Sequence, residues 1–126
     1  KGLIDEISTD YGIFPINEDI LFSCEYSINP YYDINGVGLL YYAAYPIISD
    51  KCLLTYNPDY IFYHTVFRDV FYFANSNLDD RLIFRLNSII ENENQIKFQT
   101  SLYRVSDNQL ISKILTVKQR VDELKR

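Results

Sequence analysis

One stretch of the chain carries helical spacing, and most of the sequence after it has the pattern of β-strands. Between Val37 and Cys52, apolar residues recur at helical intervals, at positions 40, 41, 44 and 48. This spacing predicts a helix over 37–52. The helix is apolar on most sides and should be buried, and Pro46 inside it should produce a kink. A buried helix followed by strands favours an α+β fold.

The remaining segments predict strands joined by short turns. β-Branched and aromatic residues are concentrated in five stretches, at 20–28, 61–74, 81–90, 95–105 and 109–121. Turn residues separate the last four stretches, so we expect an antiparallel strand meander over 60–121. The first of these four is apolar on both faces, which is typical of a central strand. Residues 1–19 are expected to be a lead-in segment with one short strand or turn of helix.

Length and composition restrict the class of protein further. The chain has 126 residues, and 1–126 is expected to be a single domain. Its net charge of −5 argues against a nucleic-acid binder. No apolar run approaches the roughly 18 residues of a membrane-spanning helix. Cys24 and Cys52 are too few for a metal cluster or a disulfide framework, and we expect buried thiols in a cytoplasmic protein. Because the sequence has no Met, we expect a processed chain or a segment of a longer one.

A helix that is apolar nearly all round is best buried by a sheet that curls around it. The predicted architecture is therefore the hot-dog fold, an antiparallel sheet of about five strands wrapped around one buried helix. Residues 28–50, INPYYDINGVGLLYYAAYPIISD, resemble a motif of a biosynthetic hot-dog family that contains the acyltransferase/decarboxylase of the leinamycin polyketide pathway. The segments 68–82 and 116–121 also resemble that family, and the resemblance spans about 20–121.

This resemblance implies an acyl group held as a thioester on coenzyme A or on an acyl carrier protein, with no further cofactor. Several members of the family carry two hot-dog domains, and this chain is similar to the second. The family's catalytic Tyr belongs to the first domain, and we assign it to no residue here.

A weaker resemblance is to hot-dog thioesterases, whose active loop reads Asp-x-x-Gly before a run such as Ile-Val-Tyr-Tyr. Aligned on that run, the segment NGVGLLYY at 35–42 puts Asn35 at the position of the acidic residue. Thioesterases of enediyne pathways also have Asn there, but their helix continues to a Cys-Arg pair where this chain has Cys52-Leu53. Acyl transfer, decarboxylation and hydrolysis all stay open as reactions.

The segment before the predicted helix holds the expected site. The free N–H groups and the positive dipole end of a helix start polarise a thioester carbonyl placed against them. The side chain of Asn35 donates a hydrogen bond to the carbonyl or orients a water, or else caps the helix. Asp33 is a general base if burial raises its pKa, or a solvated cap. The predicted catalytic residues are Asn35 and Asp33, and the predicted substrate-binding residues are Gly36, Val37, Gly38, Tyr32 and Tyr41.

Four further residues have two interpretations each. Tyr45 is a core residue, or a proton donor or nucleophile. Arg68 is a surface ion-pair residue, or it contacts a phosphate or carboxylate. Lys118 and Arg120 belong to a basic C-terminal end, which is a solvated strand end or receives phosphopantetheine or an acidic carrier protein.

The sequence thus predicts an acyl-thioester processing domain of a polyketide-type pathway. Two alternatives stay open. One is a non-catalytic half that completes a dimer pocket or docks an acyl carrier protein, and the other is a simple hot-dog thioesterase. Because hot-dog sites usually lie between two such domains, we expect a homodimer or pairing with another hot-dog domain.

Overall fold

The computed structural model describes residues 6–9, 12–15, 18–28, 43–76 and 80–121. Its elements, in chain order, are β1 (Glu6–Thr9), β2 (Gly12–Pro15), β3 (Phe22–Ser27), helix α1 (Ala44–Tyr56), the 3-10 helix η1 (Pro58–Phe62), β4 (Tyr63–Tyr72), β5 (Arg81–Glu91), β6 (Gln95–Arg104) and β7 (Gln109–Arg120). The lead-in segment contains two short strands that pair with each other, rather than one.

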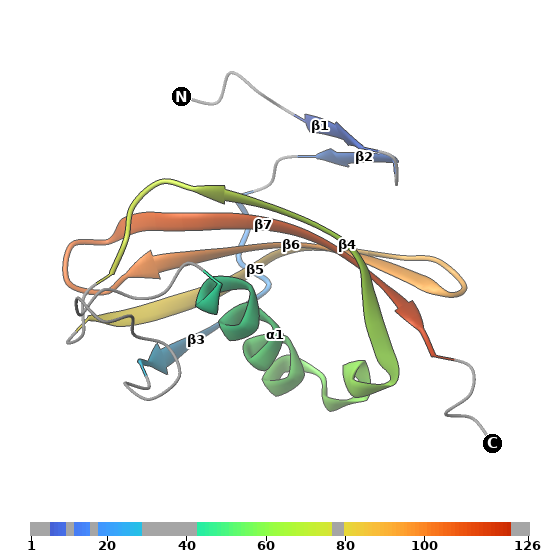
Figure 1. Ribbon diagram of the computed structural model, residues 1–126, viewed down its shortest axis with the longest axis horizontal. Helices are drawn as coiled ribbons and strands as arrows, with labels where there is room; N and C mark the ends of the chain where they lie inside the picture. The colour runs from blue at the N-terminus through green and yellow to red at the C-terminus, as the bar shows by residue number, and fades with distance from the viewer. Residues whose placement is uncertain (1–5, 10–11, 16–17, 29–42, 77–79, 122–126) are drawn as a thin grey trace.

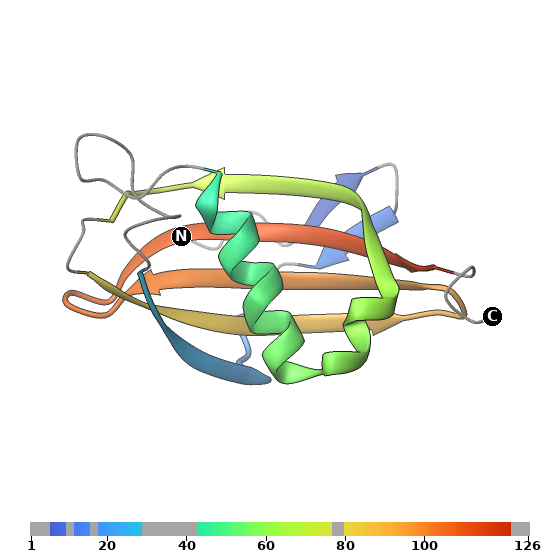
Figure 2. The ribbon, with the colours of Figure 1, turned by 60° about the horizontal axis from the view of Figure 1, so that its bottom comes forward.

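One antiparallel sheet of five strands, in the order β3-β5-β6-β7-β4, carries the fold. Helix α1 crosses one face of this sheet, and the β1–β2 hairpin lies over the other face (Figures 1 and 2). Alternate side chains of β5 and β6, such as Leu82, Phe84 and Phe98, are fully buried against the helix. This arrangement confirms the predicted fold class, an antiparallel sheet wrapped around one helix.

The strand order differs from the predicted meander at one point. Strands β5, β6 and β7 are consecutive neighbours, but β4 pairs with β7 and forms an edge of the described sheet. The prediction that the 61–74 stretch is a central strand is therefore wrong. Its apolar character has another cause: Phe67 and Phe71 pack against Leu115 and Val117 on the face away from α1, while Tyr72 contacts Tyr45 of the helix. Apolar side chains of β4 thus make contacts on both faces of the strand, although His64, Thr65 and Tyr72 stay exposed and one edge is open.

The helix begins seven residues later and ends four residues later than predicted. Pro46 is its third residue and lies in the first turn, where an amide has no intrahelical acceptor, so proline fits there and the predicted kink has no cause. The helix ends before Pro58, because the residue ahead of a proline is driven to an extended backbone. Asn57 has that conformation, with φ −147° and ψ 103°, and its side chain accepts a hydrogen bond from the Asp59 amide at 3.1 Å.

The helix is buried on one face rather than on most sides. Ile47 and Lys51 are exposed, whereas the residues that face the sheet are Ala44, Tyr45, Ile48, Ser49, Cys52 and Leu53. Cys52 is buried, as expected, and Cys24 of β3 is half-buried beside the same core. Burial, together with the neighbouring Cys24, raises the pKa of the Cys52 thiol, which keeps it protonated and unreactive.

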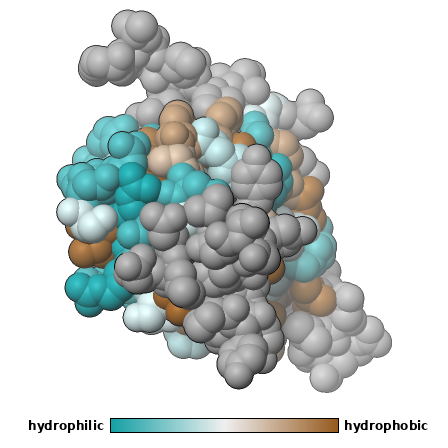
Figure 3. Space-filling model, turned by 60° about the vertical axis from the view of Figure 1, so that its left-hand side comes forward, coloured by the Kyte–Doolittle hydropathy of each residue, from teal (hydrophilic) through white to brown (hydrophobic). Residues whose placement is uncertain are grey.

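The segment before β3 is tied to the sheet by polar contacts. The Asn87 side chain donates to the Asp19 carbonyl at 2.6 Å, and the Lys113 ammonium lies 3.3 Å from the Glu18 carboxylate. On the end of the molecule seen in Figure 3, the described surface is a mixture of hydrophilic areas and separate hydrophobic patches. Of the helices in the described part of the chain, none is long and apolar enough to cross a membrane.

Candidate functional site

The predicted site residues fall between β3 and α1, outside the described residues. They are Asp33, Asn35, Gly36, Val37, Gly38, Tyr32 and Tyr41. Their roles stay predictions from the sequence. The structure describes the residue that follows this segment, Ala43, which is the N-cap residue of α1.

The start of α1 presents backbone amides rather than a side-chain cap. The N-cap residue of α1 is Ala43, which makes no side-chain cap hydrogen bond. The prediction that Asp33 or Asn35 caps a helix falls on residues outside the described part of the chain. The first amides of a helix have no intrahelical acceptor, and in α1 they belong to Ala44 and Tyr45, since Pro46 has no N–H. These amides, with the helix dipole behind them, form the described electropositive end of the segment.

Tyr45 is a core residue and not an available nucleophile. Its side chain is fully buried, its hydroxyl donates to the Asn75 side-chain oxygen, and its ring lies 5.8 Å from the ring of Tyr72. Burial raises the pKa of the Tyr45 phenol, so the phenolate is disfavoured in the folded protein. Of the two interpretations of this residue, the structural one holds.

The buried Tyr45 makes a testable contribution to alkaline stability. Its pKa lies above the ordinary value of 10.0 in the folded chain and returns to that value on unfolding. The unfolded state therefore loses this proton first, and stability should fall as the pH rises above about 10. Tyr45→Phe should flatten this fall, measured by urea unfolding between about pH 8 and pH 11. At neutral pH the variant should cost about 1 kcal/mol, because Asn75 loses its donor. Identical slopes in the two proteins would contradict this.

A cluster of charges joins the middle of α1 to β4 and β7. The Arg68 guanidinium donates to both oxygens of Asp50, at 2.7 and 3.2 Å. The Lys118 ammonium lies 3.2 Å from the same carboxylate and donates to the Thr65 hydroxyl at 3.0 Å. In the side chains, 9% of Lys118, 19% of Arg68 and 34% of Asp50 are exposed. Two cations thus share one carboxylate in a largely buried position.

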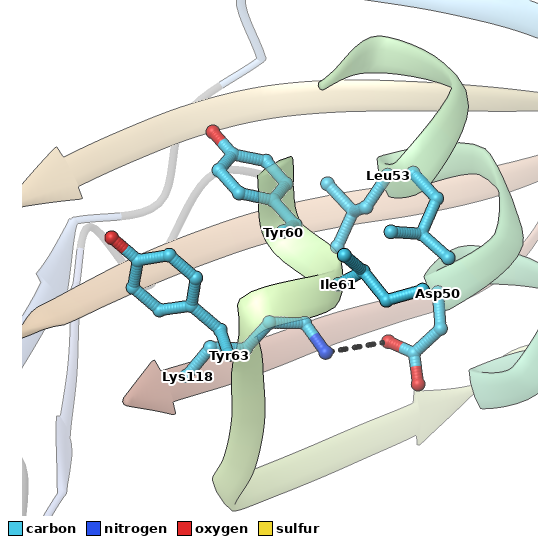
Figure 4. A pocket seen from close by; sticks show the side chains of 7 residues that line it. Asp50, Leu53, Tyr60, Ile61, Tyr63 and Lys118 are labelled. Carbon is cyan, nitrogen blue, oxygen red and sulfur yellow. Dashed lines mark ion pairs between the residues drawn. The ribbon is translucent and has the colours of Figure 1, made fainter. Parts of the chain in front are cut away.

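This cluster borders a half-open pocket of about 230 Å³ (Figure 4). The lining residues are Asp50, Leu53 and Leu54 of α1, Tyr60 and Ile61 of η1, Tyr63 of β4 and Lys118 of β7. In Figure 4 the Lys118 ammonium points at Asp50, while the rings of Tyr60 and Tyr63 lie to one side. The rings of Tyr63 and Phe98 flank that of Tyr60 at 6.0 and 5.1 Å, which holds it in place. The pocket lining therefore has a charged part, formed by Asp50 and Lys118, and a part formed by aliphatic side chains and fixed tyrosine rings.

Sequence reasoning missed this cluster. It assigned no role to Asp50, and one of its two interpretations placed Arg68 and Lys118 at the surface. The exposed interpretation is wrong for Lys118, which is buried. The alternation of Ile114, Thr116 and Lys118 along the last strand was a usable signal, because it places Lys118 on the same face as Ile114 and Thr116, which are both buried. Among the described residues, no three His, Cys, Asp or Glu side chains come together as a metal site.

The sequence matches no protein-family profile and no curated protein. Solved structures, in contrast, are similar in fold. The 1,4-dihydroxy-2-naphthoyl-CoA thioesterase from Synechocystis has 17% identity and a TM-score of 0.64, covering 78% of this chain and 80% of its own. A Thermus thermophilus thioesterase complexed with coenzyme A and Zn has 12% identity and a TM-score of 0.68, covering 80% and 84%.

A 4-hydroxybenzoyl-CoA thioesterase complexed with 4-hydroxybenzoyl-CoA has 16% identity and a TM-score of 0.65, covering 79% of this chain and 82% of its own. At these identities the likeness concerns the fold. The strand order, the helix on one face of the sheet and these matches agree, and the chain has the hot-dog fold.

Proposed function

We propose that the protein hydrolyses acyl-coenzyme A thioesters. The observation that carries this proposal is the similarity of its fold, over about four-fifths of the chain, to thioesterases that act on coenzyme A esters. The motif that resembles a thioesterase loop, Asn35 to Gly38, stands in the segment that leads into α1. Coenzyme A serves as the carrier of the substrate and not as a resident cofactor.

The proposed mechanism uses the segment between β3 and α1. The thioester carbonyl is placed against the amides of this segment and of the helix start, which stabilise the negative charge that develops on its oxygen. Asn35 orients the carbonyl or the attacking water, and Asp33 takes the proton of that water as its oxygen bonds to the carbonyl carbon. The carbon–sulfur bond then breaks, and the coenzyme A thiolate leaves with the proton that Asp33 held. Gly36 and Gly38 allow the thioester to approach the backbone, and Val37, Tyr32 and Tyr41 contact the acyl group.

We also propose that the active unit is a homodimer that pairs through β4. This strand is an edge of the described sheet, and its Phe67 and Phe71 pack against Leu115 and Val117 on one face. An open strand edge with apolar side chains invites pairing with another strand. Phe62 and Phe73 flank the strand and are 41% and 55% exposed. In an antiparallel pair about a two-fold axis at the middle of β4, Phe62 of one copy lies beside Phe73 of the other.

Release of free coenzyme A from acyl-CoA esters, followed with a thiol reagent, tests hydrolysis directly. Asn35→Ala is expected to lower kcat by about 10² to 10³, as does loss of one donor to a developing oxyanion. The control is Asn94→Ala, which removes an exposed amide in the turn between β5 and β6. Asp33→Asn should lower kcat by about 10² or more if this carboxylate is the base.

Product analysis separates this function from the two alternatives. Free acid with no acyl-enzyme in the mass spectrum is expected. Transfer of the acyl group or loss of carbon dioxide from malonyl thioesters would instead support the acyltransferase/decarboxylase of a polyketide-type pathway. An absence of turnover, with an acyl carrier protein still bound, would replace the enzyme by a non-catalytic partner domain.

A further inference from the structure

We propose that the pocket between α1, η1 and the start of β4 is a binding site for a carboxylate attached to a compact apolar body. The described lining residues come from α1, η1, β4 and β7, and the ligand is held by Lys118. The proposal does not depend on hydrolysis, because it concerns binding to residues that the structure describes.

The charge balance of the cluster calls for an anion. Arg68 and Lys118 carry two positive charges, and among the described residues Asp50 is the one carboxylate within ion-pair distance of them. The Arg68 Nε is buried and has no hydrogen-bond partner. A surplus positive charge in a largely buried position is costly unless a counter-charge accompanies it. A bound anion would supply that charge.

Lys118 is placed to receive the anion. An ammonium group has three donors, and the Lys118 ammonium donates one hydrogen bond to Thr65 and forms an ion pair with Asp50 at 3.2 Å. The residue lines the pocket, and its ammonium group points at the Asp50 carboxylate (Figure 4). A carboxylate that enters the pocket therefore meets a donor that is held in position by two fixed partners.

The remaining lining residues restrict the chemical group to which the carboxylate can be attached. Leu53, Leu54, Tyr60 and Ile61 offer hydrocarbon and aromatic surface, which excludes a strongly hydrated ion such as free phosphate. A cavity of about 150 Å³ holds benzene, so a pocket of about 230 Å³ has room for a ring or short chain together with a carboxylate. Benzoate and hexanoate are ligands of this size.

Titration of the ¹⁵N-labelled protein with benzoate and with hexanoate tests the proposal. The backbone amide signals of Leu53, Leu54 and Ile61 should shift and saturate, while benzamide and hexanamide should bind at least about tenfold more weakly. Lys118→Met should weaken binding of both acids by about tenfold or more. It leaves Asp50 and Arg68 as a balanced pair, so the variant should fold.

Two further variants keep the test sharp. Lys113→Met is the matched control, since Lys113 is a half-buried lysine of the same strand whose ammonium pairs with Glu18. It should bind both acids as the unmodified protein does. Ile61→Trp places a bulky ring on an exposed residue at the pocket wall and should weaken binding without disturbing the core.

The carboxylate has two sources, a free acid or the far end of an acyl group that carries a second carboxyl. Adipoyl-CoA and hexanoyl-CoA distinguish them: a preference for adipoyl-CoA that Lys118→Met abolishes identifies the acyl group, and equal binding of the two esters identifies the free acid. Binding that is equal for acids and amides, or unchanged in Lys118→Met, overturns the proposal. A protein that binds hexanoate but hydrolyses nothing would refute the proposed function and leave this site standing.

Discussion

Asp50→Asn is expected to lower the free energy of unfolding by about 3 kcal/mol. The substitution keeps the shape of the side chain but removes the one carboxylate that Arg68 and Lys118 share among the described residues. Both cations are largely buried, so water replaces the lost partner poorly, and each leftover charge is destabilising. Urea unfolding at neutral pH, followed by circular dichroism, measures the effect.

The matched control is Glu25→Gln. It breaks the ion pair of Glu25 with Arg81, whose atoms lie 3.1 Å apart, a distance similar to those in the Asp50 cluster. These side chains are 50% and 58% exposed, so water screens the pair and the expected cost is about 0.5 kcal/mol or less. A cost for Asp50→Asn no larger than that of the control would mean that the cluster is an ordinary surface network.

A double variant separates charge from packing. In the Asp50→Asn background, Lys118→Met removes one of the two uncompensated cations and should restore part of the lost stability. If the loss arose from packing of the Asp50 side chain, the second substitution would restore nothing. A smaller loss of stability in the double variant than in Asp50→Asn therefore indicates that the uncompensated charge causes the loss.

Strands were predictable from the sequence where apolar and polar residues alternate, because the two faces of a strand are buried to different extents. Positions 81–90 and 95–105 predict β5 and β6 to within one residue, since Ile96 and Phe98 alternate with polar neighbours and turn residues bound both stretches. The helix was harder. Its apolar periodicity continues upstream of Ala44, so spacing alone could not place the N-terminal end, and Pro46 was interpreted as a kink when it stands in the first turn.

Strand pairings and side-chain contacts between distant parts of the chain could not be predicted from the sequence. The partner of β4 is β7, whose paired residues stand at least forty positions further along the chain, whereas the short turns predicted β5 as the partner. The Asp50 cluster unites α1, β4 and β7, so no local pattern contains it. The proposed thioester segment lies outside the described residues, and its residues rest on the motif.

Phe73→Glu is expected to weaken the proposed dimer by about a hundredfold or more and to abolish hydrolysis with it. The residue is 55% exposed next to the open edge of β4, so the folded monomer tolerates a charge there. In the two-fold pair the same substitution buries two carboxylates beside Phe62 of the opposite copies, and buried aromatic residues dominate the energy of such interfaces. Sedimentation equilibrium measures the dissociation constant, and coenzyme A release measures the activity.

Ile20→Glu provides the comparison for this variant. Ile20 is 53% exposed and precedes β3, at the opposite edge of the sheet, so a charge there should leave both dimer and activity unchanged. A Phe73→Glu protein that stays dimeric would move the interface away from β4. Loss of the dimer with full hydrolysis retained would show that one copy holds a complete site, because a site shared between two copies cannot survive their separation.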